Sequence, residues 1–323
     1  MLEKLLENLK GLEPSRVLLQ VPEGLKPKVL EFAREIEKLG HEVFISAEPC
    51  FGSCDLRDRE AEKLGAVLVH IGHTDFGLKP ECRVIWEEYR LEFDPKPYLE
   101  QNLDVLKRYK TLGLLSTLQY LNSLQDAKEF LESRGISCHL GIPAGGQMLG
   151  KARYPGQILG CDLTAALSIQ NLVDAFLFLG TGRFHVLGLV RKTEKPVLML
   201  DFDSGKLEDL TDERERLERI RQACIEEAKG SKHFGILVST KPGQFRPELA
   251  VKLKKKLEEL GKQVWILVFD EITPEKILGM HLDILVNTAC PRLSEDLERF
   301  EKPVLEPEEV DRLFEKPQKP SYE

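Results

Sequence analysis

Short runs of apolar residues alternate with longer segments whose apolar residues recur at helical spacing. The first run, 16–21 (RVLLQV), is followed by segment 27–39, in which Val29, Phe32 and Ile36 fall on one helical face. Continuous apolar runs of strand length are typical of parallel strands that are buried on both faces. The alternation of such strands with helices predicts an α/β fold built from βαβ units.

This strand–helix plan occurs three times along the chain. The segments EFAREIEKLGHEVFIS, EFLESRGISCHLG and KKLEELGKQVWIL occupy equivalent places, and in each a glycine ends the helix before the next strand begins. Strands are expected at 16–21, 41–47, 66–71, 83–87, 111–115, 136–142, 174–179, 196–201, 233–239, 263–269, 282–286 and 303–305, and helices at 27–39, 58–64, 121–133, 163–172, 211–229, 247–260 and 274–278. We therefore predict three pseudo-repeated, Rossmann-like βαβ domains with parallel sheets around a central site: 1–107, 108–205 and 206–323.

Composition narrows the functional classes. Of the 323 residues 54 are acidic and 46 are basic, giving a net charge of −8, which argues against a general nucleic-acid binder. No apolar run approaches the ~18 residues of a membrane span. Segment 1–14 alternates charges with leucines and is expected to form an amphipathic helix rather than a signal peptide. We expect a cytoplasmic protein with reduced cysteines.

Seven cysteines, an odd number, argue against a disulfide framework and leave packing, metal binding or catalysis. Cys82, Cys138 and Cys224 fall at a strand start, within a strand and within a helix, so we interpret them as small buried hydrophobic residues. The other candidates lie in loops at strand ends, where parallel α/β sheets bind ligands. They are Cys54 in FGSCDLRD, Cys161 in ILGCDLTA and Cys290 in VNTACPRL, one in each repeat.

If the three domains surround one axis, these thiols converge. Three thiolates can hold three irons of a cubane cluster and leave the fourth iron open. A closed structural zinc site fits less well, because no fourth ligand stands near any of the three. Three unrelated cysteines remain an alternative. Cys50 forms Cys-x3-Cys with Cys54, but it has no third partner at short range and is interpreted as a supporting or structural residue.

Further polar residues follow the expected strands. Backbone N–H groups in small, glycine-rich loops can approach an anionic group such as a carboxylate, although each residue taken alone is more often a cap or turn residue. The residues are Gln20, Glu23, His73, Asp75, Ser116, Gln119, Thr181, Gly182, Arg183, His185, Lys241, Gly243, Gln244 and Arg292.

The motifs LLQVPEGLK, FGSCD with GHTDFG, LGCDL, LGTGRFH, STKPGQ and NTACPR, in this order, resemble the archaeal diphthamide-synthesis enzymes, the 2-(3-amino-3-carboxypropyl)histidine synthases. The resemblance spans essentially the whole chain, without departure at the cysteines. It implies a homodimer of three-domain subunits with a 4Fe–4S cluster held by Cys54, Cys161 and Cys290.

The resemblance also implies a noncanonical radical S-adenosylmethionine enzyme. Such an enzyme transfers the 3-amino-3-carboxypropyl group to imidazole C2 of a histidine in translation elongation factor 2, using electrons from a separate donor. For contacts to S-adenosylmethionine we expect Gln20, Gln244 and Arg292 at the carboxylate, and Glu23, Thr181, Gly182 and His185 nearby.

Three alternatives remain open from the sequence. One is a quinolinate synthase-like dehydratase, which also has three α/β units and a three-cysteine cluster. The second is a non-catalytic, cluster-bearing scaffold subunit. The third is a nucleotide-binding α/β protein whose cysteines are fortuitous.

Overall fold

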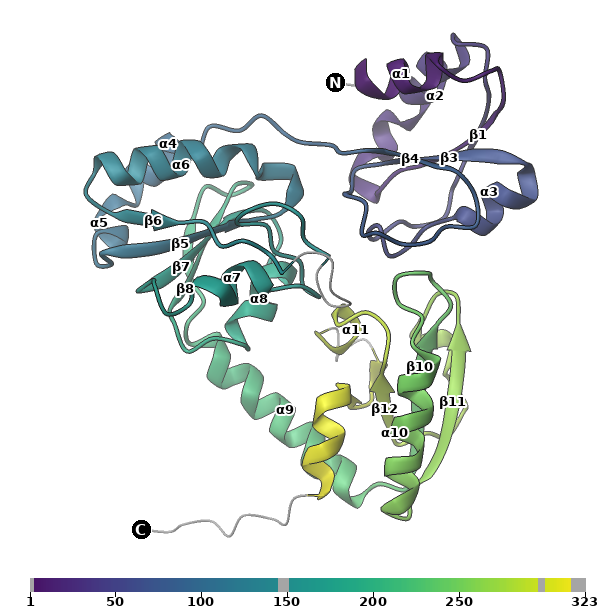
Figure 1. Cartoon of the computed structure of the whole chain (residues 1–323). Helices are drawn as coiled ribbons and strands as arrows, with labels where there is room; N and C mark the ends of the chain where they lie inside the picture. Colours follow the sequence, from purple (N-terminus) through teal and green to yellow (C-terminus); the bar gives the residue numbers. More distant parts are fainter. Residues whose placement is uncertain (1–2, 145–150, 296–299, 315–323) are drawn as a thin grey trace. The chain divides into compact units, whose positions relative to one another are not determined.

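A computed structural model describes residues 3–144, 151–295 and 300–314 of the chain (Figure 1). It contains three sheets and divides into two compact units, Met1–Thr211 with two sheets and Asp212–Glu323 with one. The predicted α/β fold with three parallel sheets is confirmed. The three-domain boundaries at 107/108 and 205/206 and the grouping around a central site stay predictions. Among the described residues, no helix is both long and apolar enough to cross a membrane.

The first sheet is parallel and has the order β2-β1-β3-β4. Its strands are β1 (Arg16–Gln20), β2 (Glu42–Ile45), β3 (Ala66–Ile71) and β4 (Val84–Glu87). Helices α1 (Glu3–Lys10) and α2 (Val29–Glu37) pack on one face, and α3 (Asp58–Leu64) packs on the other. The helix expected at 27–39 is instead a 3₁₀ helix η1 (Glu23–Lys28) followed by α2, because Pro27 lacks an N–H donor and disfavours helical backbone at the residue before it.

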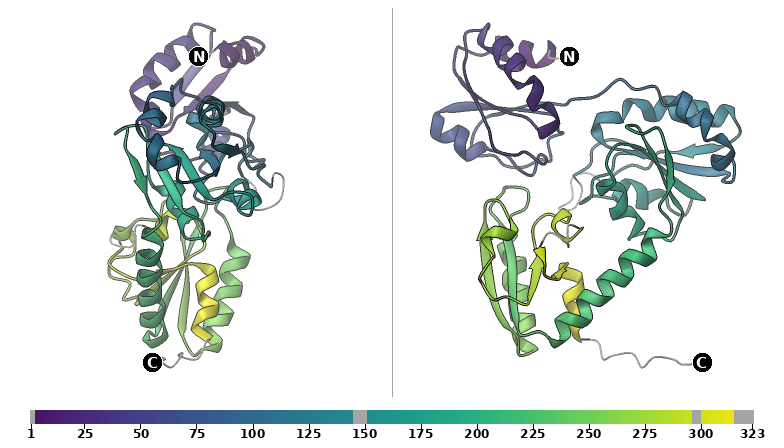
Figure 2. Two further views of the ribbon diagram at one scale, coloured as in Figure 1. Left: turned by 90° about the vertical axis from the view of Figure 1, so that its left-hand side faces the viewer. Right: turned by 180° about the vertical axis from the view of Figure 1, so that it is seen from behind.

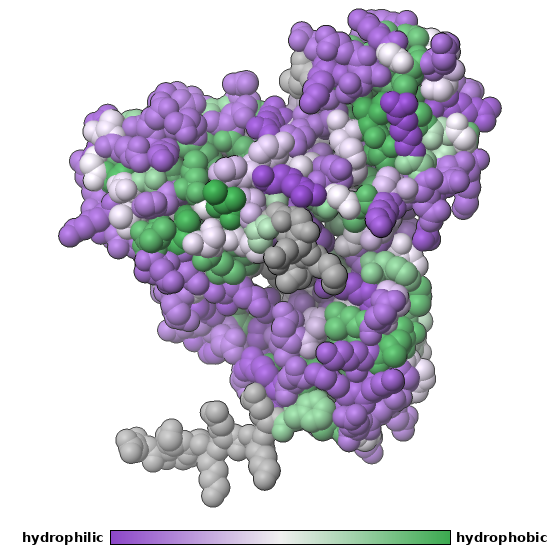
Figure 3. Space-filling view, in the orientation of Figure 1, coloured by the Kyte–Doolittle hydropathy of each residue, from purple (hydrophilic) through white to green (hydrophobic). Residues whose placement is uncertain are grey.

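The second sheet has the order β6-β5-β7-β8-β9, in which only the edge strand β9 is antiparallel. Its strands are β5 (Thr111–Ser116), β6 (Ser137–His139), β7 (Ala175–Gly180), β8 (Val197–Asp201) and β9 (Leu207–Asp209). Three helices cover one face of this sheet: α4 (Lys96–Gln101), α5 (Leu103–Leu106) and α6 (Asn122–Ser133). The short 3₁₀ helix η2 (Leu118–Tyr120) lies between β5 and α6. In Figure 3 the outer surface over α4 and α6 is mostly hydrophilic, as the amphipathic pattern of α6 requires.

Two short helices, α7 (Thr164–Ile169) and α8 (Phe184–Val190), cover the opposite face of this sheet (Figure 1). Helix α7 is shorter than the expected 163–172. The sequence did not predict α8 at all, because it contains Gly188 and lacks the capping signals of a helix start. A Cβ at Gly188 would make ordinary contact with the backbone oxygen of Gly160, at 3.4 Å, so α8 packs closely on the Cys161 turn at this position.

The second unit contains a parallel sheet of order β11-β10-β12-β13. Its strands are β10 (His233–Ser239), β11 (Gln263–Phe269), β12 (Ile284–Asn287) and β13 (Val304–Leu305). Helices α9 (Glu213–Gly230) and α10 (Pro247–Glu259) pack on one face, with the 3₁₀ helix η4 (Pro307–Phe314) between them (Figure 2). The remaining short helices are η3 (Pro274–Lys276), where a longer helix was expected, and α11 (Arg292–Glu295).

All three sheets share one topology over their first four strands. The chain runs from a central strand to one neighbour and then returns to the other side of the central strand. This reversal of strand order creates a switch point beyond the carboxyl ends of the central strands, where open α/β sheets bind ligands. Gln20 ends β1 and Ser116 ends β5 at these points, and Ser239 ends β10.

Candidate functional site

The seven cysteines fall into two groups by exposure. Cys50, Cys138 and Cys224 are buried, whereas Cys54, Cys161 and Cys290 are half-buried, as is Cys82. Burial raises the pKa of the Cys138 thiol to about 12, so that this thiol is protonated and inert at neutral pH. The three cysteines chosen from the sequence are therefore more open to a ligand than the three buried ones.

The Cys54 turn is built on a buried aspartate. Asp55 is fully buried; its carboxylate accepts a hydrogen bond from Phe51 N at 3.4 Å and lies 3.6 Å from the Arg57 guanidinium. Its backbone oxygen accepts a hydrogen bond of 2.6 Å from the amide nitrogen of Gln20, at the end of β1. Ser53, on the other side of the cysteine, donates its hydroxyl to Thr74 O. Buried neighbours on both sides thus fix the turn that carries Cys54.

The Cys161 turn is also held by a buried aspartate, but this aspartate has different hydrogen-bond partners. Asp162 is buried, and one carboxylate oxygen accepts hydrogen bonds from Lys151 N at 2.6 Å and Ala152 N at 2.7 Å. The other accepts from Thr164, from its backbone N–H at 3.0 Å and its hydroxyl at 2.6 Å. Reciprocal backbone bonds between residues 159 and 162 close the turn with Cys161 inside it.

A glycine precedes the cysteine because the Cys161 turn is crowded. A Cβ at Gly160 would overlap the aromatic ring of Phe184 at the start of α8. The N–H of Gly160 donates to Nδ1 of His185 at 3.0 Å, which leaves the hydrogen of this neutral ring on Nε2. The shared Gly-(Ser)-Cys-Asp motif therefore has a physical basis: the buried aspartate anchors each turn, and in the Cys161 turn the glycine also permits close packing against Phe184.

The two turns lie in the same unit, and the charge of one cysteine affects the pKa of the other. Burial raises the pKa of the Cys161 thiol, Lys151 lowers it, and the neighbouring Cys54 raises it. Hydrogen bonds also connect the two turns. The backbone oxygen of Asp75 accepts a bond of 3.1 Å from Arg153. Asp75 follows Thr74, the partner of Ser53 in the Cys54 turn, and Arg153 follows Ala152, a partner of Asp162 in the Cys161 turn. The structure thus brings two of the three predicted cysteines into one region.

Cys290 belongs to the second unit and follows β12. The amide nitrogen of Asn287 donates to Cys290 O at 2.8 Å and to Ser294 Oγ at 2.9 Å, and Asn287 Oδ1 accepts from Ala289 N at 2.9 Å. Thr288 is also buried and donates its hydroxyl to Leu237 O on β10 at 2.7 Å. The sequence NTAC therefore forms a turn that is bonded to the neighbouring strand and leaves the Cys290 side chain half-buried.

Gln20 begins a chain of buried side chains beside the Cys54 turn. Its Oε1 accepts from Arg57 N at 3.3 Å and lies 3.0 Å from Nδ1 of His70 on β3. His70 Nε2 lies 3.0 Å from Nδ1 of His73. Burial lowers the pKa of His73 to about 4 and that of His70 well below its ordinary value, with the charge of His73 adding to the effect at His70. Both rings are therefore neutral near pH 7.

The other predicted contact residues lie at strand ends in their own units. Glu23 is exposed at the start of η1 and pairs with Lys26 at 2.6 Å. Thr181 and Gly182 follow β7, with Gly182 in the left-handed region at φ 77°, whereas His185 lies inside α8 rather than in the predicted loop. In the second unit, Gln244 is buried after β10, and Arg292 is exposed after β12, so both stand at the carboxyl edge of adjacent strands.

In the structure Gln20 and His185 each hold one of the cysteine turns, and their expected contact with a cosubstrate stays a prediction. Gln20 is fully buried and bonds the Cys54 turn, while His185 bonds the Cys161 turn. Sequence reasoning missed His70, Asp55 and Asp162. A histidine within the apolar run AVLVHI was the available signal for His70, and the repeated Cys-Asp pair was the signal for the two aspartates.

Comparison with known proteins agrees with this architecture. The chain matches the family "Putative diphthamide synthesis protein" over residues 21–323. It is 34% identical to a 2-(3-amino-3-carboxypropyl)histidine synthase of Pyrococcus horikoshii, covering 96% of this chain and 89% of the relative. It is also 29% identical to subunit 1 of the synthase of Mus musculus, covering 95% of this chain and 70% of the relative.

The fold of the whole chain has solved counterparts. A crystal structure of Dph2 from Pyrococcus horikoshii with a 4Fe–4S cluster matches with a TM-score of 0.88 and 34% identity, covering 96% of this chain and 89% of that one. A second crystal structure of this Dph2 matches with a TM-score of 0.89 and 33% identity, covering 98% and 91% of the two chains. The chain therefore belongs to the diphthamide synthesis protein family, the family of the 2-(3-amino-3-carboxypropyl)histidine synthases.

Proposed function

We propose that this chain transfers the 3-amino-3-carboxypropyl group of S-adenosylmethionine to imidazole C2 of a histidine in translation elongation factor 2, the first step of diphthamide biosynthesis. The observation that carries the proposal is the 34% identity to an archaeal synthase over 96% of the chain. The family match favours this activity over the quinolinate synthase-like alternative.

We propose Cys54, Cys161 and Cys290 as the ligands of a 4Fe–4S cluster. The donor set fits the group, because each cysteine is half-buried in a braced turn and three thiolates leave one iron open to a non-protein ligand. A relative of known structure holds a 4Fe–4S cluster. When bound and reduced, such a cluster supplies the electron that cleaves the Cγ–S bond of S-adenosylmethionine.

The remaining tasks belong to the protein itself: binding the cosubstrate, orienting its sulfonium and excluding water from a reactive group. Thr181 and Gly182 after β7, and Gln244 and Arg292 in the second unit, are the proposed contacts to the methionine moiety, with Glu23 nearby. Arg292 suits the carboxylate because a guanidinium binds carboxylates in a bidentate manner. Gln20 and His185 support the proposal indirectly, since they brace the turns that carry Cys54 and Cys161.

Single serine variants of Cys54, Cys161 and Cys290 test the ligand set. We expect each to lose most of the iron and of the cluster absorbance, and to abolish the release of methylthioadenosine from S-adenosylmethionine under anaerobic, reducing conditions. Cys138→Ser is the matched control, because Cys138 is buried on β6. Wild-type iron content in any of the three variants would remove that cysteine from the set.

The acceptor is tested separately by the mass of elongation factor 2 after incubation with the loaded enzyme. A mass gain on its target histidine, dependent on S-adenosylmethionine, is the expected result. If modification requires a second protein chain, the scaffold alternative is favoured. The mouse relative is named subunit 1 of its synthase, which motivates this test.

A further inference from the structure

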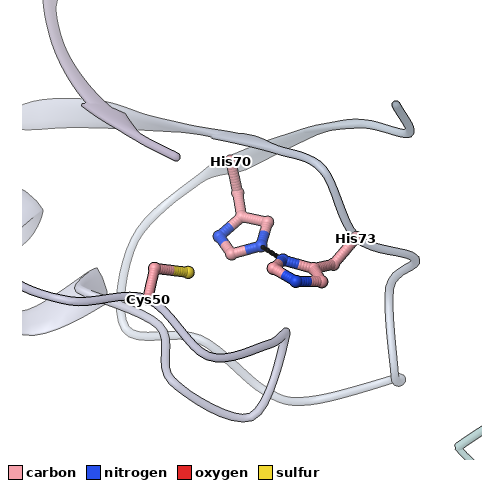
Figure 4. Close-up of side chains that lie close together, drawn as sticks. All are labelled: Cys50, His70 and His73. Atoms are coloured by element: carbon pink, nitrogen blue, oxygen red, sulfur yellow. Dashed lines mark hydrogen bonds between the residues drawn. The ribbon is translucent and has the colours of Figure 1, made fainter. Parts of the chain in front are cut away.

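The carboxyl end of the first sheet holds a second group of side chains of metal-binding type. Cys50, His70 and His73 each offer one ligand atom, and these atoms lie within 4.8 Å of one another. In Figure 4 the sulfur of Cys50 points toward the two imidazole rings, which are joined by a hydrogen bond. The three residues come from the loop after β2, from β3 and from the loop after β3.

Hydrogen bonds fix which nitrogen of His70 can bind a metal. The Gln20 amide nitrogen donates to Asp55 O, so Gln20 Oε1 is an acceptor, and it already receives the N–H of Arg57. Nδ1 of His70, 3.0 Å from this oxygen, must therefore carry the ring hydrogen. Since the ring is neutral, its Nε2 presents a lone pair toward His73.

This arrangement matches the usual surroundings of a metal-bound histidine. One ring nitrogen donates to a fixed oxygen, which holds the ring and the tautomer, and the other faces the metal. Burial keeps His73 neutral as well. In the metal-free state His73 Nδ1–H donates to His70 Nε2; this is the one hydrogen bond between the two rings that a metal would replace.

We propose that Cys50, His70 and His73 form a zinc-type site, distinct from the cysteines of the proposed cluster. The thiolate and two imidazoles suit zinc, and the absence of a carboxylate among the three ligands disfavours magnesium and calcium. Ligands of a tetrahedral zinc ion lie about 3.3–3.6 Å apart. The two facing ring nitrogens, now 3.0 Å apart, must therefore separate slightly, and the remaining adjustment is small because all three ligand atoms lie within 4.8 Å of one another.

Binding has a simple proton balance. The Cys50 thiol releases its proton to solvent, the hydrogen of His73 moves from Nδ1 to Nε2, and His70 keeps its hydrogen on Nδ1. Water completes the four ligands on the side of His73, the least buried member of the three. Cys50 and Gln20 both belong to the surroundings of the Cys54 turn, so a bound metal pins this turn to β3.

Metal analysis of the full-length, cluster-loaded chain after exposure to Zn²⁺ and desalting tests the site. We expect about one zinc ion per chain in wild type and at least a tenfold loss in Cys50→Ala and in His73→Asn. His73 is half-buried, whereas His70 is fully buried, so a variant at His73 is less prone to misfolding than one at His70. His139→Asn, at a half-buried histidine on β6, is the matched control and should keep the zinc.

Cys54→Ser separates this site from the proposed cluster, since it should lose iron and keep zinc. Zinc that disappears together with iron in this variant would mean that it occupied the cluster ligands, and would overturn the proposal. So would a wild type that retains no zinc, or zinc that both Cys50→Ala and His73→Asn leave unchanged. A chain that binds zinc but never iron would refute the proposed function while sustaining this site.

Discussion

At the scale of single residues, Asp55 and Asp162 decide how two of the proposed ligands are presented. Each follows a half-buried cysteine and is itself almost completely buried. Their carboxylates bind backbone N–H groups or lie beside a buried guanidinium, which compensates for the loss of hydration on burial. Each buried aspartate therefore holds the half-buried cysteine before it in a fixed turn.

Asp162→Asn tests this anchoring. The carboxylate uses both oxygens as acceptors, toward Lys151 and Ala152 on one side and Thr164 on the other. The asparagine side chain has only one acceptor oxygen. Its NH₂ group would therefore face N–H donors, either those of Lys151 and Ala152 or that of Thr164. We expect a loss of about 1–3 kcal/mol in the free energy of unfolding, measured by urea denaturation, together with reduced iron content. Asp203→Asn, at an exposed aspartate of the same unit, should change neither; equal stability of the two variants would refute the anchoring role.

The sequence identified the cysteines because their loops follow strands in a recognisable repeat. It did not reveal that Gln20 and His185 brace the turns. Their partners are 35 and 25 residues away along the chain, and only the packing of strands and helices brings those groups within hydrogen-bond distance.

At the scale of elements, two aspartates repeat the same contact at the opposite edge of their sheets. Asp174 precedes β7 and accepts hydrogen bonds from the N–H groups of Lys110 and Thr111, at 2.9 Å each. Asp283 precedes β12 and accepts from Lys232 N at 3.1 Å and His233 N at 2.8 Å. Each aspartate thereby fastens the start of the third strand to the start of the first.

This contact predicts a dependence of stability on pH. The backbone N–H groups of His233 and Lys232 lower the pKa of Asp283, so the folded chain binds a proton there less readily than the unfolded chain. The stabilisation is complete above the ordinary carboxyl pKa and is lost as pH falls through the lowered value. We expect Asp283→Asn to lower the urea midpoint at pH 7, and the difference from its parent to shrink near pH 3.

The measurement uses the chain without cluster ligands, Cys54→Ser/Cys161→Ser/Cys290→Ser, so that loss of iron in acid does not contribute. Glu301→Gln is the control, at an exposed carboxylate of the same unit. A difference between Asp283→Asn and its parent that stays constant from pH 7 to pH 3 would contradict the assigned contact.

The sequence predicted the helices and strands that have a strong hydrophobic pattern, and it missed those whose hydrophobic pattern is weak. Buried strands such as β7 and β10 and the amphipathic helix α10 stand out by composition alone. The helix α8 and the antiparallel edge strand β9 do not, because tertiary contacts stabilise them: Phe184 against the Cys161 turn, and β9 through pairing with β8.

At the scale of the whole molecule, the proposed cluster takes ligands from both compact units, Cys54 and Cys161 from the first and Cys290 from the second. A group bound by both units stabilises both, because it binds only when both are folded. Cluster loading should therefore raise the unfolding midpoints of both units together.

The two tryptophans make this measurable, since Trp86 lies in the first unit and Trp265 in the second. Fluorescence of Trp86→Phe and Trp265→Phe variants follows one unit each during anaerobic urea unfolding. We expect both midpoints to rise on loading, and neither to rise in a Cys290→Ser background. A rise confined to the first unit would show that Cys290 is not a ligand.

The sequence alone determined the α/β class, the threefold repeat and the cysteines at strand ends, because hydrophobic periodicity and turn residues are local properties of the chain. Only the tertiary structure decided that buried aspartates brace the Cys54 and Cys161 turns and that the ligand atoms of Cys50, His70 and His73 lie within 4.8 Å of one another. These contacts join residues from different strands and loops, and their distances depend on how the sheets twist and pack, which no local pattern encodes.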